Sequence, residues 1–292
     1  MLLTMGKEIT NHPECLYDLK LDGWRILIHK QGTRIEAYTR HGNRVTEQFP
    51  ELQEVKRCIK VDTAILDCEG VVIRDGVSNF DDFAYRGRLR NKDKINQAMV
   101  THPVTFGVFD VLATNKSLHL KEPLIQRKNL IHEIIEPSPV MIPTPYTIGN
   151  GNHFYQVTKE KGMEGIVEKP IHSTYQLNTR SPEWIKHKHF KRMNTVIMGY
   201  KENPFNMIVG SIFKNGTLKS VASVEFGFKP EEKQAFRKIA KGLITKREQG
   251  VNWIEPVLCC EVQYLEKTHN QKLRIVSFKG FQFDTKPEDC VI

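Results

Sequence analysis

The pattern of apolar residues changes at Lys191-Arg192-Met193, and this change constrains the fold more than any other feature of the sequence. Before it, several apolar-rich strand-like runs occur together with one amphipathic helical segment. After it come many short strand-like runs, interrupted by one charged helical segment over 230–243. A stretch of this kind suits a five-stranded barrel with an inserted helix. We therefore predict two domains, residues 1–191 and 192–292, of which the first mixes α and β structure.

Several segments have patterns that indicate individual elements. The runs 24–30 and 34–39 flank Gln31-Gly32, which indicates a β-hairpin. Residues 123–136 begin with proline and carry apolar residues at roughly helical spacing, which indicates an amphipathic helix. Further strands are expected over 63–73, 106–112, 165–167 and 184–188 in the first domain, and over 195–198, 207–213, 220–226 and 257–264 in the second.

The charge of the chain favours a polyanionic or phosphate-bearing ligand without identifying one. Lys and Arg total 43 against 34 Asp and Glu, a net charge of +9, which a basic housekeeping enzyme also shows. The hydrophobic share of 39% is that of a globular chain, which argues against disorder, collagen and coiled coil. A basic run has two interpretations, phosphate contact or a solvated helix face; its members are Arg86, Arg88, Arg90, Lys92 and Lys94.

Targeting and cysteine patterns exclude other classes. No apolar stretch approaches the roughly 18 residues of a membrane span, so we expect no membrane partner. The six cysteines form no C-x-x-C pair, so a zinc site of the usual spacing is not expected. With no export signal, reduced thiols and a cytoplasmic location are the simplest interpretation.

A lysine between carboxylates is the first candidate for chemistry. On a strand, Asp18, Lys20 and Asp22 would share one face while the intervening leucines face a core, and Gly23 would help to turn the chain. Such a lysine could act as a nucleophile, but nearby carboxylates raise its pKa, and attack requires the neutral amine. A divalent cation or other cationic side chains could offset this effect. A salt-bridged surface strand is the structural alternative.

Six segments in order resemble the motifs of the covalent nucleotidyltransferases, specifically the small ATP-dependent DNA ligases of bacteria and their phages. They are K-L-D-G-W-R at 20–25, T-R-H-G-N at 39–43 with F-P-E-L at 49–52, L-D-C-E-G at 66–70, F-D at 109–110, E-G-I-V-E-K at 164–169 and W-I-K-H-K at 184–188. In the second half, segments 253–256, 261–264 and 273–281 resemble the OB domain of bacterial ligases. The resemblance implies an α+β nucleotidyltransferase (ATP-grasp-like) domain followed by a β-barrel OB-fold domain.

The resemblance also implies a reaction in three phosphoryl transfers. Lys20 attacks the α-phosphate of ATP and becomes lysyl-AMP, the AMP passes to a 5′-phosphate at a nick in duplex DNA, and the 3′-OH then displaces AMP. Asp22, Lys186 and Lys188 would complete the catalytic set. The last two lysines alternate in a strand, so their like charges need an anion, for which the α-phosphate is the candidate.

Further roles follow from the same resemblance. Phe109 would stack on adenine and Val167 would close the opposite face of the base. Glu69 would bind the ribose hydroxyls or Mg²⁺, with Asp67 and Glu164 as further metal ligands and Mn²⁺ as an alternative ion. The other expected nucleotide contacts are Asp18, at the adenine amino group, Leu19, Arg25, Arg40, Lys169, Lys186 and Lys188. The expected DNA contacts are Arg25, Arg40 and Arg180.

One segment departs from the family pattern. Relatives usually read Gly-Leu-Arg-x-Asp-Lys in their last motif, whereas this chain reads G-F-Q-F-D-T-K over 280–286. Gln282 therefore replaces an arginine expected to help orient pyrophosphate. Arg274, Lys279 or Lys286 could substitute for it.

We therefore predict an ATP-dependent DNA ligase that seals 5′-phosphate/3′-OH nicks as a monomer. An RNA ligase or an mRNA-capping guanylyltransferase is the alternative within the superfamily, and a non-catalytic OB-type nucleic-acid binder is the alternative of a different class. A repair or end-binding protein that recruits the chain is a possible partner. The sequence leaves open whether replication, repair, recombination, end joining or phage metabolism is served.

Overall fold

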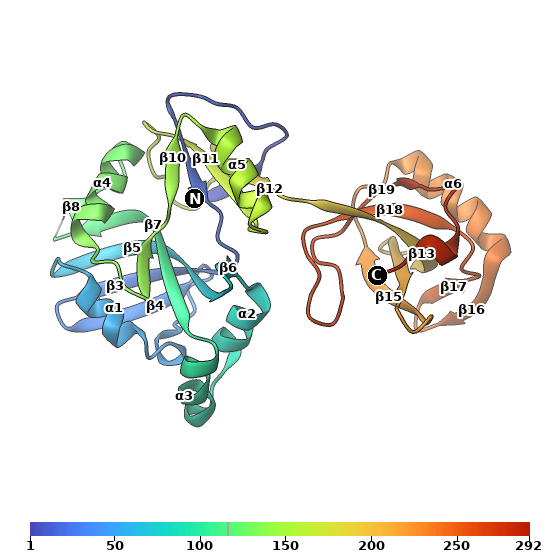
Figure 1. Ribbon diagram of the computed structural model, residues 1–292, viewed down its shortest axis with the longest axis horizontal. Helices are drawn as coiled ribbons and strands as arrows, with labels where there is room; N and C mark the ends of the chain where they lie inside the picture. Colours follow the sequence, from blue (N-terminus) through green and yellow to red (C-terminus); the bar gives the residue numbers. More distant parts are fainter. Residues whose placement is uncertain (116) are drawn as a thin grey trace. The chain divides into compact units, whose positions relative to one another are not determined.

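The computed structural model describes residues 1–115 and 117–292, which form two compact units, Met1–His189 and Phe190–Ile292 (Figure 1). The sequence placed the boundary two residues later, after residue 191. The difference arises because β13 (Lys191–Lys201) already belongs to the sheet of the second unit, where Lys191 pairs with Tyr264 of β18 (Cys259–Tyr264).

The first unit contains two sheets. The first sheet has the order β1 (Leu2–Met5), β12 (Arg180–Lys188), β11 (Gly165–Pro170), β2 (Cys15–Leu19) and β10 (Tyr146–Ile148). The second sheet has the order β4 (Arg34–Thr39), β3 (Trp24–Gln31), β5 (Thr63–Arg74), β7 (Val104–Thr114) and β8 (Ser117–Leu118). Two short strands extend it: β6 (Val77–Ser78) pairs with β5, and β9 (Met141–Pro143) pairs with β7.

Helices cover one face of the second sheet and leave the other face for a site. The helices α1 (Leu52–Cys58), α2 (Phe80–Arg88) and α4 (Leu124–Ile134) share a buried core with this sheet. Leu66 and Cys68 of β5 point into that core. Because side chains alternate along a strand, Asp67 and Glu69 point to the opposite face. Two further helices are α3 (Lys92–Thr101) and α5 (Gly151–Glu160).

The predicted elements of the first unit are confirmed with small shifts of their ends. β3 and β4 form the predicted hairpin, and β5, β7, β11 and β12 contain the other predicted strands. The predicted helix over 123–136 is α4, which begins directly after Pro123. The fixed φ of proline suits this position at the start of a helix.

The second unit is a single seven-stranded sheet, whereas a five-stranded barrel was predicted. Its predicted elements are β13, β14 (Asn206–Ile212), β15 (Leu218–Val224), β18 and α6 (Pro230–Ala240), which a 3-10 turn over Lys241–Leu243 extends. The remaining strands are β16 (Ile244–Glu248), β17 (Val251–Ile254) and β19 (Ser277–Phe281). β16 is almost entirely exposed, so it lacks the apolar alternation by which a strand is recognised.

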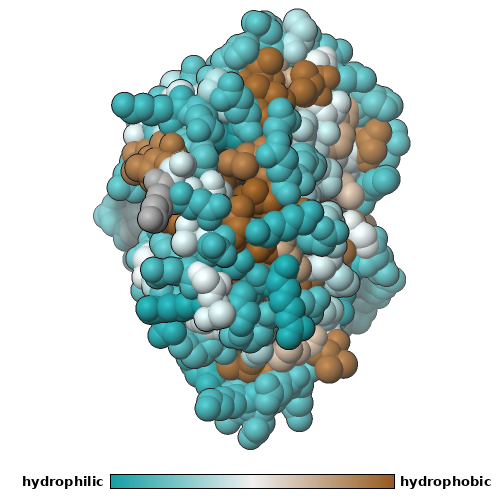
Figure 2. All heavy atoms as spheres, turned by 90° about the vertical axis from the view of Figure 1, so that its left-hand side faces the viewer, coloured by the Kyte–Doolittle hydropathy of each residue, from teal (hydrophilic) through white to brown (hydrophobic). Residues whose placement is uncertain are grey.

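One face of the molecule is mainly polar. On the face drawn in Figure 2, hydrophilic side chains predominate and apolar side chains gather in a few separate patches. Within the part of the chain that the structure describes, no helix is long and apolar enough to cross a membrane.

Candidate active site

A cavity of about 640 Å³ lies between the two sheets of the first unit. Strands β2, β11 and β12 form one wall, β3, β5 and β7 form the other, and the end of β4 lies at the rim. Twelve predicted site residues line it: Asp18, Leu19, Lys20, Arg25, Arg40, Glu69, Phe109, Val167, Lys169, Arg180, Lys186 and Lys188. The other three, Asp22, Asp67 and Glu164, are buried and are not part of the lining. The topology thus brings most of the predicted set to one place.

The strand that carries Asp18 ends before the lysine, contrary to the sequence prediction. β2 stops at Leu19, and Lys20 begins the loop into β3. The predicted facing is also wrong, because Asp18 and Asp22 are buried whereas Leu19 and its neighbour at 21 are half-buried in the cavity wall. Asp18 can be buried because Lys128 and Lys169 pair with its two oxygens.

Gly23 explains how the loop holds the lysine against the second sheet. A Cβ at Gly23 would lie 1.9 Å from the carbonyl oxygen of Gly70, so only glycine allows the loop to approach β5 this closely. The Gly23 N–H then donates to Glu69 Oε1 at 3.2 Å. The glycine therefore places the carboxylate of Glu69 beside the lysine loop.

Lys20 lies among carboxylates that keep it protonated. Its Nζ is 2.5 Å from Glu164 Oε2, and Nζ of Lys188 is 2.5 Å from Glu164 Oε1. Burial lowers the pKa of Lys20, but Glu164, Glu69 and Asp22 together outweigh burial and raise the pKa above its ordinary value. The sequence predicted this difficulty. The free site holds an ammonium group that must lose its proton before it can attack.

Glu69 is a buried carboxyl whose surroundings disfavour its charged form. Burial, followed by the nearby carboxylates of Glu164 and Asp22, raises its pKa to about 8, although Lys20 and the Gly23 N–H oppose the shift. A divalent cation bound beside these carboxylates would stabilise their charged forms. Among the described residues, no three acidic, histidine or cysteine side chains form a complete metal site. The arrangement fits a cation that keeps several waters and shares phosphate ligands.

Basic side chains on β12 lie beside these carboxylates, and Lys188 is paired with Glu164. Lys186 and Lys188 both line the cavity, as their alternation predicted. Burial lowers the pKa of Lys186, and the positive charges of Lys188, Lys20 and Arg180 lower it further. Like charges gathered in this way are stabilised by a bound anion such as a phosphate.

The opposite end of the cavity is suited to a planar base. Phe109 on β7 is half-buried, while its neighbours Val108 and Asp110 are fully buried. Val167 on β11 is also buried in the lining. An aromatic ring and a branched aliphatic side chain on different walls provide apolar surface for the two faces of a base.

Asp67 is paired with side chains of the protein itself. It is fully buried, and its two oxygens accept from Arg25 Nε at 2.8 Å and Nη2 at 2.5 Å. The Tyr175 hydroxyl also donates to it, at 2.6 Å. The remaining nitrogen of Arg25 donates to the carbonyl of Met1. The metal role of Asp67 and the nucleotide and DNA contacts of Arg25 therefore stay predictions.

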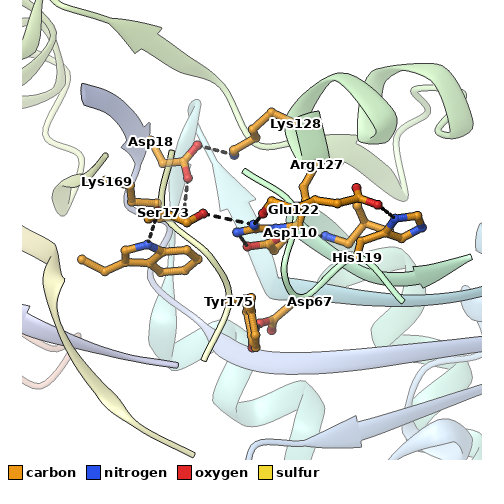
Figure 3. Close-up of polar contacts among 12 residues, drawn as sticks. Asp18, Asp67, Asp110, His119, Glu122, Arg127, Lys128, Lys169, Ser173 and Tyr175 are labelled. Atoms are coloured by element: carbon orange, nitrogen blue, oxygen red, sulfur yellow. Dashed lines mark hydrogen bonds and ion pairs between the residues drawn. The ribbon is translucent and has the colours of Figure 1, made fainter. Parts of the chain in front are cut away.

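Lys169 lines the cavity near Phe109, and its predicted contact with the nucleotide stays a prediction. Its Nζ is 2.5 Å from Asp18 Oδ2 (Figure 3). The same Nζ is 4.2 Å from the centre of the Trp184 ring. The other oxygen of Asp18 is 2.5 Å from Lys128 Nζ. Because two lysines hold this carboxylate, the predicted contact between Asp18 and the adenine amino group stays a prediction.

Sequence reasoning missed two buried cations on α4. Lys128 reaches Asp18, and Arg127 binds Asp110 through Nε at 2.7 Å and Nη2 at 3.1 Å (Figure 3). Burial lowers the pKa of Lys128, although Asp18 opposes the shift. A signal was available for Lys128, since it follows Leu124 by four residues and so falls on the buried face of the predicted helix.

Two arginines remain at accessible positions. Arg40 and Arg180 are exposed and line the cavity, and Arg180 donates to the carbonyl of Leu3. In the second unit, Arg274 pairs with Glu266, and Lys286 lies 3.8 Å from Glu288. The contacts of Arg40 and Arg180 with DNA therefore stay predictions.

The cavity between the two sheets contains a lysine among carboxylates and a row of further cations. This site defines a nucleotidyltransferase domain, which is followed by a strand-rich second unit. The family model for the ATP dependent DNA ligase domain matches residues 3–188, and the model for the ATP dependent DNA ligase C terminal region matches residues 201–285. The chain belongs to the ATP-dependent DNA ligase family. The predicted fold class, with its OB-fold domain, is confirmed.

Similar proteins support this assignment. The SPbeta prophage-derived DNA ligase-like protein LigB of Bacillus subtilis (strain 168) is 32% identical over 97% of this chain and 98% of its own length. The bifunctional non-homologous end joining protein LigD of the same strain is 31% identical over 99% of this chain, which spans only 50% of LigD. These matches favour a DNA ligase over the RNA ligase, capping and binding-module alternatives.

Solved structures agree on the fold. A Lig E DNA ligase structure superposes with a TM-score of 0.65 at 17% identity, with 96% of this chain and 98% of that chain covered. A mycobacterial DNA ligase D complexed with ATP and MES superposes with a TM-score of 0.57 at 24% identity, over 99% of this chain and 96% of that one.

Proposed function

We propose that this chain seals nicks in duplex DNA through a lysyl-AMP intermediate on Lys20. The observation that carries the proposal is the position of Lys20, which lines the cavity together with Lys186 and Lys188 of β12 and is joined to Lys188 through the carboxylate of Glu164. A nucleophile, an anion site and an apolar base site occur in one cavity. Covalent catalysis of this kind divides a difficult transfer into two easier ones.

In the first step, Lys20 attacks the α-phosphate of ATP and pyrophosphate leaves. Lys186 and Lys188 are placed to neutralise charge on the phosphate, which is the main contribution a protein makes to phosphoryl transfer. Phe109 and Val167 are placed to hold the base. Glu164 is a candidate acceptor for the Lys20 proton, because it already contacts Nζ.

Mg²⁺ fits the carboxylates around Lys20. Glu69 and Glu164 would hold it, with the rest of its coordination from water and phosphate oxygens. When bound, the ion supplies positive charge, which favours the neutral amine of Lys20 and offsets charge on the phosphates. The raised pKa of Glu69, caused first by burial and then by Glu164 and Asp22, supports this proposal, since a bound cation would favour the charged form that these surroundings disfavour.

In the second and third steps, AMP moves to the 5′-phosphate at a nick, and the 3′-OH then displaces it. Arg40 and Arg180 are the side chains best placed to meet the DNA phosphates, because they are exposed where the cavity opens. The net charge of +9 supports binding to a polyanion.

A nick-sealing assay tests the proposal. Duplexes with a single 5′-phosphate/3′-OH nick, in DNA or in RNA, are incubated with ATP and Mg²⁺ and resolved on a denaturing gel. We expect sealing of the DNA nick, loss of sealing in Lys20→Ala, and full sealing in Lys7→Ala, an exposed lysine outside the cavity. Sealing of RNA alone would replace the proposal with an RNA ligase, and unchanged sealing by Lys20→Ala would refute the nucleophile.

A further inference from the structure

A buried hydroxyl in the cavity has no partner within the part of the chain that the structure describes. Thr144 is 3% exposed, its Oγ1 has no hydrogen-bond partner there, and the residue lines the cavity. A buried hydroxyl without a partner is unfavourable and uncommon in folded proteins. Its presence in a ligand cavity indicates that a bound molecule supplies the missing bond.

The backbone places Thr144 between the two residues expected to contact the base. Its N–H donates to the carbonyl of Val108 at 2.8 Å, directly before Phe109 on β7. The carbonyl of the next residue, Pro145, accepts from the N–H of Leu19 at 2.8 Å, directly after Asp18 on β2. Thr144 therefore joins the wall that carries the aromatic ring to the wall that carries the carboxylate.

Gly107 keeps the threonine hydroxyl close to β7. A Cβ at Gly107 would lie 2.3 Å from Leu21 Cδ1 and 3.3 Å from Thr144 Oγ1, so the glycine makes room for both side chains. Leu21 is also part of the cavity lining. The hydroxyl thus lies in an otherwise apolar part of the wall, where a single hydrogen bond to a ligand has a large influence on its orientation.

We propose that Thr144 is a base-reading residue, whose hydroxyl hydrogen-bonds the edge of adenine that carries the 6-amino group. This inference rests on the proposed function and names a specificity residue for it. A threonine hydroxyl both donates and accepts, so it can pair with the amino group or with an adjacent ring nitrogen. Asp18, whose oxygens are held by Lys128 and Lys169, accepts and does not donate, which suits an amino group and not the 6-oxygen of guanine.

The test compares lysyl-AMP formation in Thr144→Val and Thr144→Ser. Valine has nearly the same shape without the hydroxyl, so Thr144→Val should raise the KM for ATP about threefold to tenfold, the range of one neutral hydrogen bond, with little change in kcat. Thr144→Ser should retain a KM near that of the wild type. The melting temperature of free Thr144→Val should stay constant or rise, because the change removes an unpaired buried group.

Thr158→Val is the matched control. Thr158 is equally buried, but its hydroxyl donates to the carbonyl of Tyr155 at 2.9 Å and lies 2.9 Å from His189 Nε2. Thr158→Val should therefore lower the melting temperature and leave the KM for ATP unchanged. The opposite behaviour of the two threonines separates ligand recognition from a structural role.

Nucleotide analogues identify the partner atom. Purine riboside, 1-deazaadenosine and 7-deazaadenosine triphosphates each lack one polar group of this edge, and the Thr144→Val penalty should disappear with the analogue that lacks the partner. An unchanged KM for ATP, or a penalty that persists with all three analogues, would overturn the inference while wild-type adduct formation leaves the ligase proposal intact. Absence of any adduct in the wild type would instead refute the proposed function, and this inference with it.

Discussion

Glu164→Gln should lower the pKa of Lys20 in the protein without nucleotide or metal. Glu164 contacts Lys20 Nζ at 2.5 Å and is the strongest of the carboxylates that oppose the effect of burial. A hydrogen bond that involves a charged group contributes about 1.5–3 kcal/mol. Since about 1.4 kcal/mol corresponds to a factor of ten, the loss of this interaction should raise the fraction of neutral Lys20 about tenfold or more at a pH below its pKa. Glu69 and Asp22 remain near the lysine, so part of the upward shift should persist.

Competitive labelling measures this shift directly. Trace amounts of an amine-specific reagent are added across a range of pH, and the modification of the Lys20 peptide is quantified by mass spectrometry against exposed lysines. Half-maximal labelling of Lys20 should move to lower pH in Glu164→Gln. Glu160→Gln, an exposed change at the end of α5, should leave it unchanged.

The same variant separates two functions of Glu164. If Glu164 also helps to hold Mg²⁺, then adduct formation by Glu164→Gln should need a higher Mg²⁺ concentration even though its lysine deprotonates more easily. A labelling profile identical to that of the wild type would refute the argument that this carboxylate sets the pKa of the nucleophile.

Three further predictions follow from the structure. The metal-free wild type should lose stability between pH 5 and pH 9, as measured by urea unfolding, and Glu69→Gln should remove this loss. The pKa of Glu69 in the folded protein, about 8, lies above its value in the unfolded chain. Glu69 therefore stabilises the fold below the unfolded pKa and loses this contribution as the pH rises through 8. Gly23→Ala should slow adduct formation about tenfold or more with unchanged circular dichroism, because its Cβ would meet the Gly70 carbonyl at 1.9 Å; wild-type rates would contradict this. Arg86→Met should lower the free energy of unfolding by about 3–5 kcal/mol, because it leaves Glu51, paired at 2.6 Å, buried without its cation; a urea midpoint near that of the wild type would argue against it.

Local patterns were enough to predict most of the fold and much of the cavity lining. Apolar alternation located β3, β5 and β7, and the spacing of apolar residues located α4. These signals are strong because one face of each element packs against a core. The seven-stranded second unit was predicted less completely, since β16 is almost entirely exposed.

Pairing between charged side chains could not be predicted from local patterns. Asp67 and Glu69 both alternate onto the cavity side of β5, yet only Glu69 lines the cavity, because Arg25 on the adjacent strand binds Asp67. In the same way, Arg86 belongs to a basic run, but it is fully buried against Glu51 and so fits neither interpretation given to that run. Such pairs depend on contacts between distant segments, which spacing along the chain does not encode.

Thr144 shows a second limit of sequence reasoning. A threonine between two short strands carries no motif, and its significance comes only from burial, from its unpaired hydroxyl and from its position between β7 and β2. A buried lysine such as Lys128 is easier to find, since its position on the apolar face of a helix is visible in the sequence. Recognition of a base thus depends on residues that only the folded chain brings together.

The most direct test of the account is the covalent adduct itself. The protein is mixed with Mg²⁺ and α-labelled ATP, GTP or NAD in turn, resolved on a denaturing gel, and the labelled peptide is identified by mass spectrometry. Pyrophosphate pretreatment removes any AMP already bound. We predict a labelled band with ATP alone, a label that is attached to Lys20, and no band in Lys20→Ala. A band with GTP or NAD in place of ATP, a label on another residue, or no band after pyrophosphate treatment would contradict it.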